Sequence, residues 1–253
     1  MKPIPKLTFE SKDNNSQTWR FIDVIVILLG IGIIFACSFI IIRWISNLAN
    51  PNFAVVSEPT TAQSLGLAII EAIALLAGVY FFGLRRLHYR WKDIGFNKIG
   101  RKWLVATISI SIVVIPLSGL ITILVVLALG LPLENPQLEF LIPEDFSWIS
   151  GIGLFIFGGI VVPIAEEVFF RGVLYKWLRE RWGVFIGVSV SSIIFGLVHI
   201  DIAIAATAFV LGIVLALIYE YSNSLWTAIL IHIINNGVKI ILLYLLFVLG
   251  IPL

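Results

Sequence analysis

The sequence predicts an all-α protein, a polytopic helical bundle of about seven or eight transmembrane helices in an integral membrane protein. Composition is the first reason: 60% of the 253 residues are hydrophobic and 13% are charged, whereas soluble domains carry roughly 25% charged residues. The mean hydropathy of +1.06 is the second. The third is a series of apolar runs long enough to cross the hydrocarbon core, which takes about 20 residues.

The same composition excludes two kinds of site. The net charge is only +2, and no basic stripe with interleaved aromatic residues is present, which argues against nucleic acid as a partner. The single cysteine, Cys37, lies inside the first apolar run, where we expect it to face lipid or fill a packing gap. One cysteine forms no disulfide and no thiolate metal framework within the chain.

The first half of the chain begins with a polar segment, 1–20, whose mixed charge is unlike a signal peptide, so we expect an uncleaved start. The first span covers 21–45, and an exposed loop leads to the second span, 63–84. Glu71 lies inside that second span. An intramembrane glutamate is a functional candidate, but one without visible companions more often makes an interhelical hydrogen bond.

A strongly basic loop separates the second span from the third. By the positive-inside rule this loop is cytoplasmic, which places the N-terminus in the cytoplasm as well. The third span, 103–131, is interrupted by Pro116 and Gly119, and the acidic segment 132–147 after it suits the outer side. The basic residues of the loop are Arg85, Arg86, Arg90, Lys92, Lys98, Arg101 and Lys102.

The second half of the chain holds further apolar runs, at 148–177, 182–200, 202–221 and 225–249. A second basic loop, with Lys176, Arg179 and Arg181, follows the first of these runs and lies on the same side as the first basic loop. The last run is either one long helix or two parts broken near Gly237.

A charged cluster interrupts the run 148–177. Residues four apart share a helix face, so Glu167 pairs with Arg171, while Glu166 is rotated about 100° away and is left for chemistry. Pro163 tends to kink the helix, and with Gly158 and Gly159 it could open a polar notch beside the glutamates. The competing interpretation is a buried ion-pair cluster that only locks helix packing.

Two of the three histidines, His199 and His232, lie inside predicted membrane. His232 shares a face with Asn236, and His199 shares one with Phe195. Counting about 1.5 Å per residue from the loops puts Glu166 and these polar groups at a similar depth. Three helices therefore bring their polar groups to one level, which packing alone explains poorly.

This set of side chains suits hydrolysis by water. A glutamate base takes a proton from water, while other donors stabilise the oxyanion of the tetrahedral intermediate. Alternatively, Glu166, His199 and His232 could hold a zinc ion, because one glutamate and two histidines form a known catalytic ligand set. The compact His-Glu-x-x-His pattern is absent, so such a site needs ligands from three helices.

Three motifs, Glu166-Glu167-x-x-x-Arg171, Phe195-x-x-x-His199 and His232-x-x-x-Asn236, follow one another on successive apolar runs. In this order they resemble the CAAX protease and bacteriocin-processing family of intramembrane proteases, which includes the type II CAAX prenyl endopeptidases and the bacterial Abi-type proteins. The resemblance covers about 148–236.

The resemblance implies a glutamate-dependent endopeptidase acting on a membrane-associated substrate, such as a prenylated CAAX-type or leader-containing protein. Carried over by position, Glu166 and His199 activate the water, His232 and Asn236 form the oxyanion site, and Glu167 and Arg171 hold the architecture, with Phe195 in support. No cofactor is expected to be required, because Asn236 is a poor zinc ligand and a good oxyanion donor.

The resemblance also divides the chain into a polar N-terminal segment, 1–20, variable membrane helices, 21–147, and a catalytic membrane core, 148–253. Its partners are then the lipid bilayer and a membrane-associated peptide or protein. Two other interpretations stay open. One is a non-catalytic membrane scaffold or bacteriocin self-immunity protein; the other is a transporter, although the chain shows neither inverted repeats nor paired broken helices.

Overall fold

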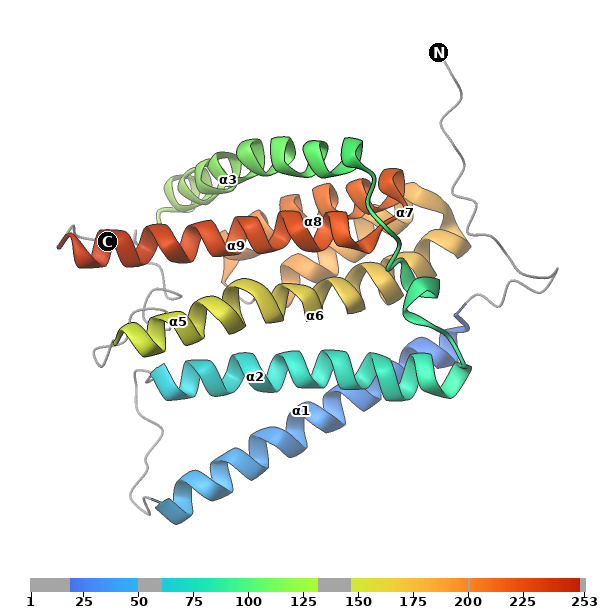
Figure 1. Ribbon diagram of the computed structural model, residues 1–253, viewed down its shortest axis with the longest axis horizontal. Coiled ribbons are helices and arrows are strands. Elements are labelled where there is room, and N and C mark those ends of the chain that lie inside the picture. The colour runs from blue at the N-terminus through green and yellow to red at the C-terminus, as the bar shows by residue number, and fades with distance from the viewer. Residues whose placement is uncertain (1–18, 50–60, 132–146, 200, 251–253) are drawn as a thin grey trace.

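Helices are the only regular structure in the residues described by the computed structural model, which are 19–49, 61–131, 147–199 and 201–250 (Figure 1). The predicted all-α bundle is therefore confirmed. The helices, in chain order, are α1 (Phe21–Ala49), α2 (Thr61–Ala77), the π-helical η1 (Gly78–Arg85), the 3-10 helix η2 (Trp91–Ile94), α3 (Arg101–Leu129), α5 (Trp148–Ile156), the π-helical η3 (Phe157–Val161), α6 (Val162–Phe169), the π-helical η4 (Phe170–Tyr175), α7 (Lys176–Leu197), α8 (Ile202–Ser222) and α9 (Leu225–Val248).

Six of the described helical stretches are long and apolar enough to cross a membrane. The longest, Gly151–Leu197, has 47 residues and contains a turn at Gly183, whose backbone (φ 81°, ψ 175°) is not helical. Figure 1 shows the chain reversing its direction in this region, so the stretch holds two crossings. The described residues thus hold six membrane-length stretches, near the predicted seven or eight.

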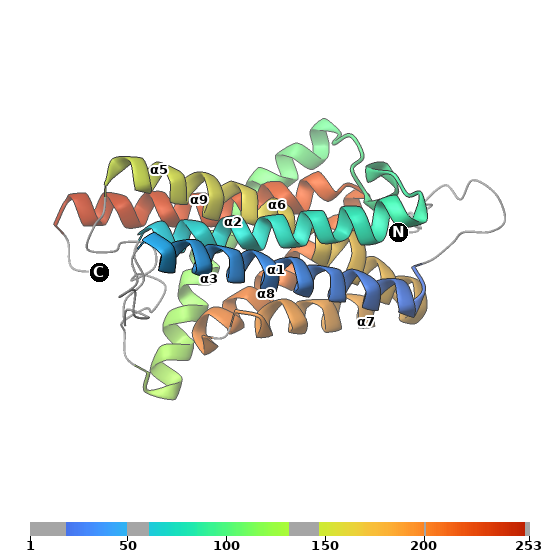
Figure 2. The ribbon, with the colours of Figure 1, turned by 90° about the horizontal axis from the view of Figure 1, so that it is seen from below.

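The helices run along the long axis of the molecule (Figures 1 and 2). α7 packs along α8, α1 pairs with α2 and η1, and α3 lies against both α8 and α9. α3 crosses the others obliquely in Figure 2. α1 and α3 expose large apolar side chains, such as Ile40 and Leu127, while α6 is almost fully buried. The catalytic segment predicted from the sequence thus lies inside the bundle, with α1 and α3 facing lipid.

Two predicted interruptions leave the helices continuous. α9 is a single helix through Gly237, and α3 continues through Pro116 and Gly119. Near Pro163 the chain forms the π-helical η3 immediately before α6, and it does not break. Proline removes one backbone hydrogen bond of a helix. A short π-helical segment next to it lets the freed carbonyl group bond to another backbone group nearby, so a membrane helix can continue.

The end of the bundle that holds the basic loops is tied together by polar contacts. Lys176 donates to the carbonyl of Asp93, Asn97 Nδ2 donates to the carbonyl of Asn223 at 2.8 Å, and Leu225 N donates to the carbonyl of Gly95 at 2.7 Å. The two basic loops therefore lie on one side of the bundle, as predicted, and the α8–α9 turn lies there with them.

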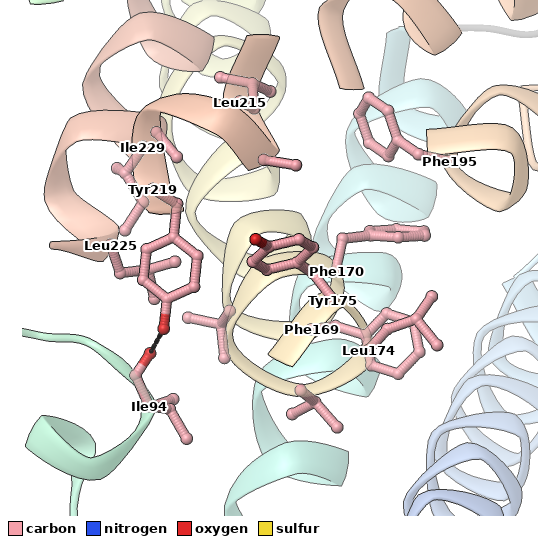
Figure 3. Close-up of a cluster of buried hydrophobic side chains, with 14 of the residues drawn as sticks. Ile94, Phe169, Phe170, Leu174, Tyr175, Phe195, Leu215, Tyr219, Leu225 and Ile229 are labelled. Atoms are coloured by element: carbon pink, nitrogen blue, oxygen red, sulfur yellow. Dashed lines mark hydrogen bonds between the residues drawn. The ribbon is translucent and has the colours of Figure 1, made fainter. Parts of the chain in front are cut away.

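Figure 3 shows the apolar core next to this end. Phe170 and Tyr175 from η4 pack among Leu215 and Tyr219 of α8, and Tyr219 Oη donates to the carbonyl of Ile94 at 3.2 Å. Glycine is required at position 95, where φ is +102° and an added Cβ would lie 2.6 Å from the Tyr219 ring. This core fixes α6 and η4, and with them the charged cluster.

Candidate active site

The charged cluster lies on α6 and η4 and is buried. Glu166 is 6% exposed, Glu167 is 0% exposed and Arg171 is 1% exposed, so water does not screen their charges. Arg171 Nη1 donates to Glu167 Oε1 at 2.7 Å, which is the predicted pairing one helical turn apart. The guanidinium also donates from Nη2 to the carbonyl of Gly212 at 3.2 Å and lies 4.5 Å from the centroid of the Phe195 ring.

Glu167 has a second partner on a distant helix. Its Oε1 atom lies 2.9 Å from His232 Nδ1 in α9. Because an ionised carboxylate only accepts hydrogen bonds, this contact assigns the proton to Nδ1. Glu167 therefore does more than pair with Arg171: it also sets the orientation of the His232 ring, and α6 is tied to α9.

That orientation turns the other ring nitrogen of His232 toward Glu166. His232 Nε2 lies 3.6 Å from Glu166 Oε2, which is longer than a hydrogen bond but close enough for a charge interaction. No other cation pairs with Glu166 among the described residues. The two adjacent glutamates thus occupy different environments: Glu167 is held by two donors, and Glu166 faces one histidine nitrogen.

His199 and His232 both lie against the ring of Phe195. The Phe195 centroid is 5.0 Å from that of His199 and 5.7 Å from that of His232, both in edge-to-face geometry. His199 Nδ1 lies 2.7 Å from the carbonyl of Phe195, one turn earlier on α7. This contact fixes the ring and leaves Nε2 as its remaining polar atom, so Phe195 contacts both histidines.

Burial lowers the pKa of His199, which lies in the turn between the α7 and α8 spans, from its ordinary value of 6.5. The backbone hydrogen bond to Phe195 acts in the opposite direction, and the positive charges of neighbouring side chains add to the lowering. The imidazole is consequently neutral near pH 7, the state in which a histidine accepts a proton.

Asn236 lies one turn after His232 on α9, and its side-chain amide is partly fixed. Asn235 Nδ2 donates to Asn236 Oδ1 at 3.0 Å, so the amide nitrogen of Asn236 is the end left to donate. Asn235 is itself 1% exposed, and its Oδ1 accepts from Ser118 of α3 at 3.5 Å. Asn235 was not among the predicted site residues, although its position next to Asn236 in an apolar run was a visible signal.

Glu71 of α2 joins the cluster and was also underestimated. α2 packs on α6, and the Glu71 carboxylate lies close enough to Glu166 for the two to interact electrostatically. The sequence showed Glu71 without companions because its companion lies on a helix far along the chain.

The predicted polar notch beside the glutamates is not formed by the glycines. A Cβ added at Gly159 would lie 3.5 Å from the Cα of Gly237, so these two glycines let η3 and α9 approach closely. This part of the prediction was wrong, because the glycine allows two helices to pack closely and does not open a polar space.

The alternative ligand set of Glu166, His199 and His232 is not gathered around one point. Among the described residues, no three His, Cys, Asp or Glu side chains form a group positioned to hold a metal ion. The structure brings Glu166 to His232, and it brings His199 to the same phenylalanine ring.

Comparison with known proteins places the resemblance on this part of the chain. Residues 148–238 match the family described as type II CAAX prenyl endopeptidase Rce1-like. The chain is 32% identical over 89 residues to YdiL of Bacillus subtilis, a protein assigned as a membrane peptidase, and 33% identical over 97 residues to the membrane-embedded CAAX protease MroQ of Staphylococcus aureus.

These matches cover 35% and 36% of this chain, and 36% and 39% of the two relatives. The chain thus matches little more than a third of the length of each relative. No solved structure gives a significant match. The family predicted from the three motifs is confirmed for the segment that carries them.

Proposed function

We propose that this protein is an intramembrane endopeptidase that hydrolyses a peptide bond of a membrane-associated substrate with water activated by Glu166. The observation that supports this most directly is the unequal use of the two adjacent glutamates. Glu167 accepts from Arg171 and His232 at 2.7 and 2.9 Å, whereas Glu166 has only the 3.6 Å approach of His232 Nε2. A buried carboxylate without its own cation is suited to taking up a proton.

In the proposed reaction, Glu166, assisted by His199, removes a proton from water as the oxygen attacks the peptide carbonyl carbon. The carbonyl oxygen becomes an oxyanion, which accepts from the amide nitrogen of Asn236 and from His232 Nε2 when that atom carries a proton. The proton on Glu166 then passes to the leaving nitrogen, and the carbon–nitrogen bond breaks. The products are a carboxylic acid and an amine, and no cofactor enters the balance.

The substrate class follows from the environment of the site. The cluster lies inside helices that are apolar enough to cross a membrane, so the substrate reaches it from the bilayer or its surface. A prenylated CAAX-type protein or a leader-containing peptide fits this requirement, because a lipid or a hydrophobic segment holds either one at the membrane. The alternative is a zinc-dependent version of the same reaction, which a strong chelator would stop.

The test is turnover by purified protein in detergent against a library of membrane-anchored and lipidated peptides. Wild type is compared with Glu166→Gln, and with Glu180→Gln as a matched change at the edge of the bundle. We expect Glu166→Gln to lose about 10²–10⁴-fold in turnover while its thermal midpoint is unchanged, and Glu180→Gln to keep activity. Cleavage should survive a strong chelator.

Other outcomes decide against parts of the proposal. Loss of cleavage on chelation moves the reaction to a zinc-dependent mechanism. Equal turnover by wild type and Glu166→Gln removes Glu166 as the base. A protein that cleaves nothing in the library, yet keeps a protective effect in cells after Glu166→Gln, is a scaffold or immunity protein.

We also propose that the N-terminus and both basic loops face the cytoplasm. The loops share one end of the bundle through the contact of Lys176 with Asp93, and basic loops are retained on the cytoplasmic side. In a Cys37→Ser background, Lys98→Cys should resist a membrane-impermeant maleimide in intact cells and react after lysis. Labelling in intact cells would reverse the orientation.

A further inference from the structure

One basic side chain inside the membrane has no role in the mechanism above. Lys239 lies in α9, 14 positions after the first residue of that helix, within a span of 24 residues. It has no hydrogen-bond or ion-pair partner in the part of the chain that the structure describes, and its side chain is exposed at the protein surface. A lysine near the centre of a membrane helix costs at least about 2.5–3.5 kcal/mol, so it normally has a partner or a function.

Lys239 lies on the same face of α9 as His232 and Asn236. Steps of 100° per residue place His232, Asn236 and Lys239 within about 60° of one another on the helix surface. His232 on this face contacts Glu167 and Glu166. The positive charge of Lys239 is also one of the smaller causes that lower the pKa of His199. The lysine therefore belongs to the face that holds the proposed catalytic residues.

Lys239 is too far from the end of α9 for its ammonium group to reach the membrane surface easily. Nine residues, about 14 Å of helix, separate Lys239 from Val248, the last residue of α9. Lysines that reach the interface are found near helix ends. Helical side chains also lean toward the N-terminus of their helix, which for Lys239 is the direction of Asn236 and His232.

The distance from the site indicates what Lys239 binds. Seven residues of helix, about 10 Å, separate His232 from Lys239, and an extended peptide covers about 3.3 Å per residue. We propose that Lys239 binds a carboxylate that the substrate carries about three residues from the scissile bond. This inference rests on the proposed function for the meaning of the scissile bond, but the binding itself does not require turnover.

Binding is therefore measured in the inactive Glu166→Gln background. The probe is a dansyl-labelled, N-dodecanoylated hexapeptide of alanine, valine and leucine in three forms: with a free C-terminal carboxylate, with a C-terminal amide, and with the amide plus one aspartate. Fluorescence anisotropy gives the affinity in neutral phosphatidylcholine nanodiscs. The added variants are Lys239→Gln, Lys239→Arg and the matched surface change Lys98→Gln.

We expect at least one carboxylate form to bind about 10-fold or more tightly than the plain amide, as for a charge-assisted hydrogen bond. Lys239→Gln should remove this preference, and Lys239→Arg and Lys98→Gln should keep it. Comparison of the two carboxylate forms tells whether the bound group is a chain terminus or a side chain.

Three results would overturn the inference: equal binding of all forms, a preference that survives Lys239→Gln, and a Lys239-dependent loss of the preference when phosphatidylglycerol replaces phosphatidylcholine. The last result would assign Lys239 to a lipid phosphate. A Lys239-dependent preference together with no cleavage of any peptide by wild type supports the carboxylate site and counts against the protease instead.

Discussion

Replacing Arg171 with methionine tests the buried cluster most severely. The guanidinium donates to Glu167 Oε1 at 2.7 Å and to the carbonyl of Gly212 at 3.2 Å, and it lies over the Phe195 ring. The pair is 1% and 0% exposed, so solvent cannot take over the lost interactions. Methionine keeps most of the volume, so the effect reports the stranded carboxylate and not a cavity.

Breaking a buried pair by removing one partner costs about 3–5 kcal/mol. We expect the lower end of that range, because His232 Nδ1 still donates to Glu167 at 2.9 Å. For a chain of this length each kcal/mol moves the thermal midpoint by about 2–4 °C. Arg171→Met should therefore lower the midpoint by about 6–12 °C.

The second half of this test is the double variant Arg171→Met/Glu167→Gln. Glutamine removes the unpaired charge and still accepts from His232, so the double variant should be more stable than Arg171→Met alone. Thermal unfolding of detergent-solubilised protein, followed by size-exclusion chromatography, measures all three midpoints. An Arg171→Met midpoint equal to that of wild type, or a double variant no better than the single one, would refute the structural assignment of Arg171.

Three further predictions concern packing, the loop contact and protonation. Gly196→Ala should destabilise the protein by about 1–3 kcal/mol, because the new Cβ would lie 2.7 Å from a backbone carbonyl of α8, whereas Gly66→Ala has nothing within 4 Å and should be neutral. Tyr219→Phe should cost about 0.5–1.5 kcal/mol and speed proteolysis of the loop around Ile94, because it removes the 3.2 Å hydrogen bond to that carbonyl. Turnover should fall only below pH 6.5. Burial lowers the pKa of His199 from that value, so the imidazole is still neutral at pH 6.5 and becomes protonated only at lower pH.

Each of these has an outcome that contradicts it. Equal midpoints for the two glycine variants would mean that α7 and α8 are not packed as closely as described. Unchanged proteolysis after Tyr219→Phe would separate the loop from α8. If the acidic limb of the pH–rate profile has its midpoint above 6.5, the loss of turnover is not due to protonation of His199.

The sign of the pH effect on stability follows from the same lowered pKa. The unfolded chain binds a proton on His199 at its ordinary value of 6.5, and the folded chain binds it only at lower pH. Stability from this residue is therefore complete above 6.5 and declines as the pH falls through that value toward the folded pKa. Thermal midpoints measured along the same pH series check this direction.

Features that depend on neighbours along the chain were predictable from the sequence. Apolar runs of membrane length identified the helices, and their basic flanks identified the loops that lie together. The pairing of Glu167 with Arg171 was predictable because residues four apart always meet on a helix face. The grouping of His232 with Asn236 on one face has the same origin, and so does the contact of His199 with Phe195.

Contacts between one helix and another were visible only once the helices were packed. The contact of Glu167 with His232 spans 65 positions of sequence, and that of Ser118 with Asn235 spans 117. Glu71 looked isolated in the sequence because its companion, Glu166, lies on another helix. Helical periodicity fixes the face of a side chain but not the rotation or depth at which helices pack. The rotation and depth of each helix depend on the sizes of the residues at the contact, as where two glycines let η3 approach α9 closely.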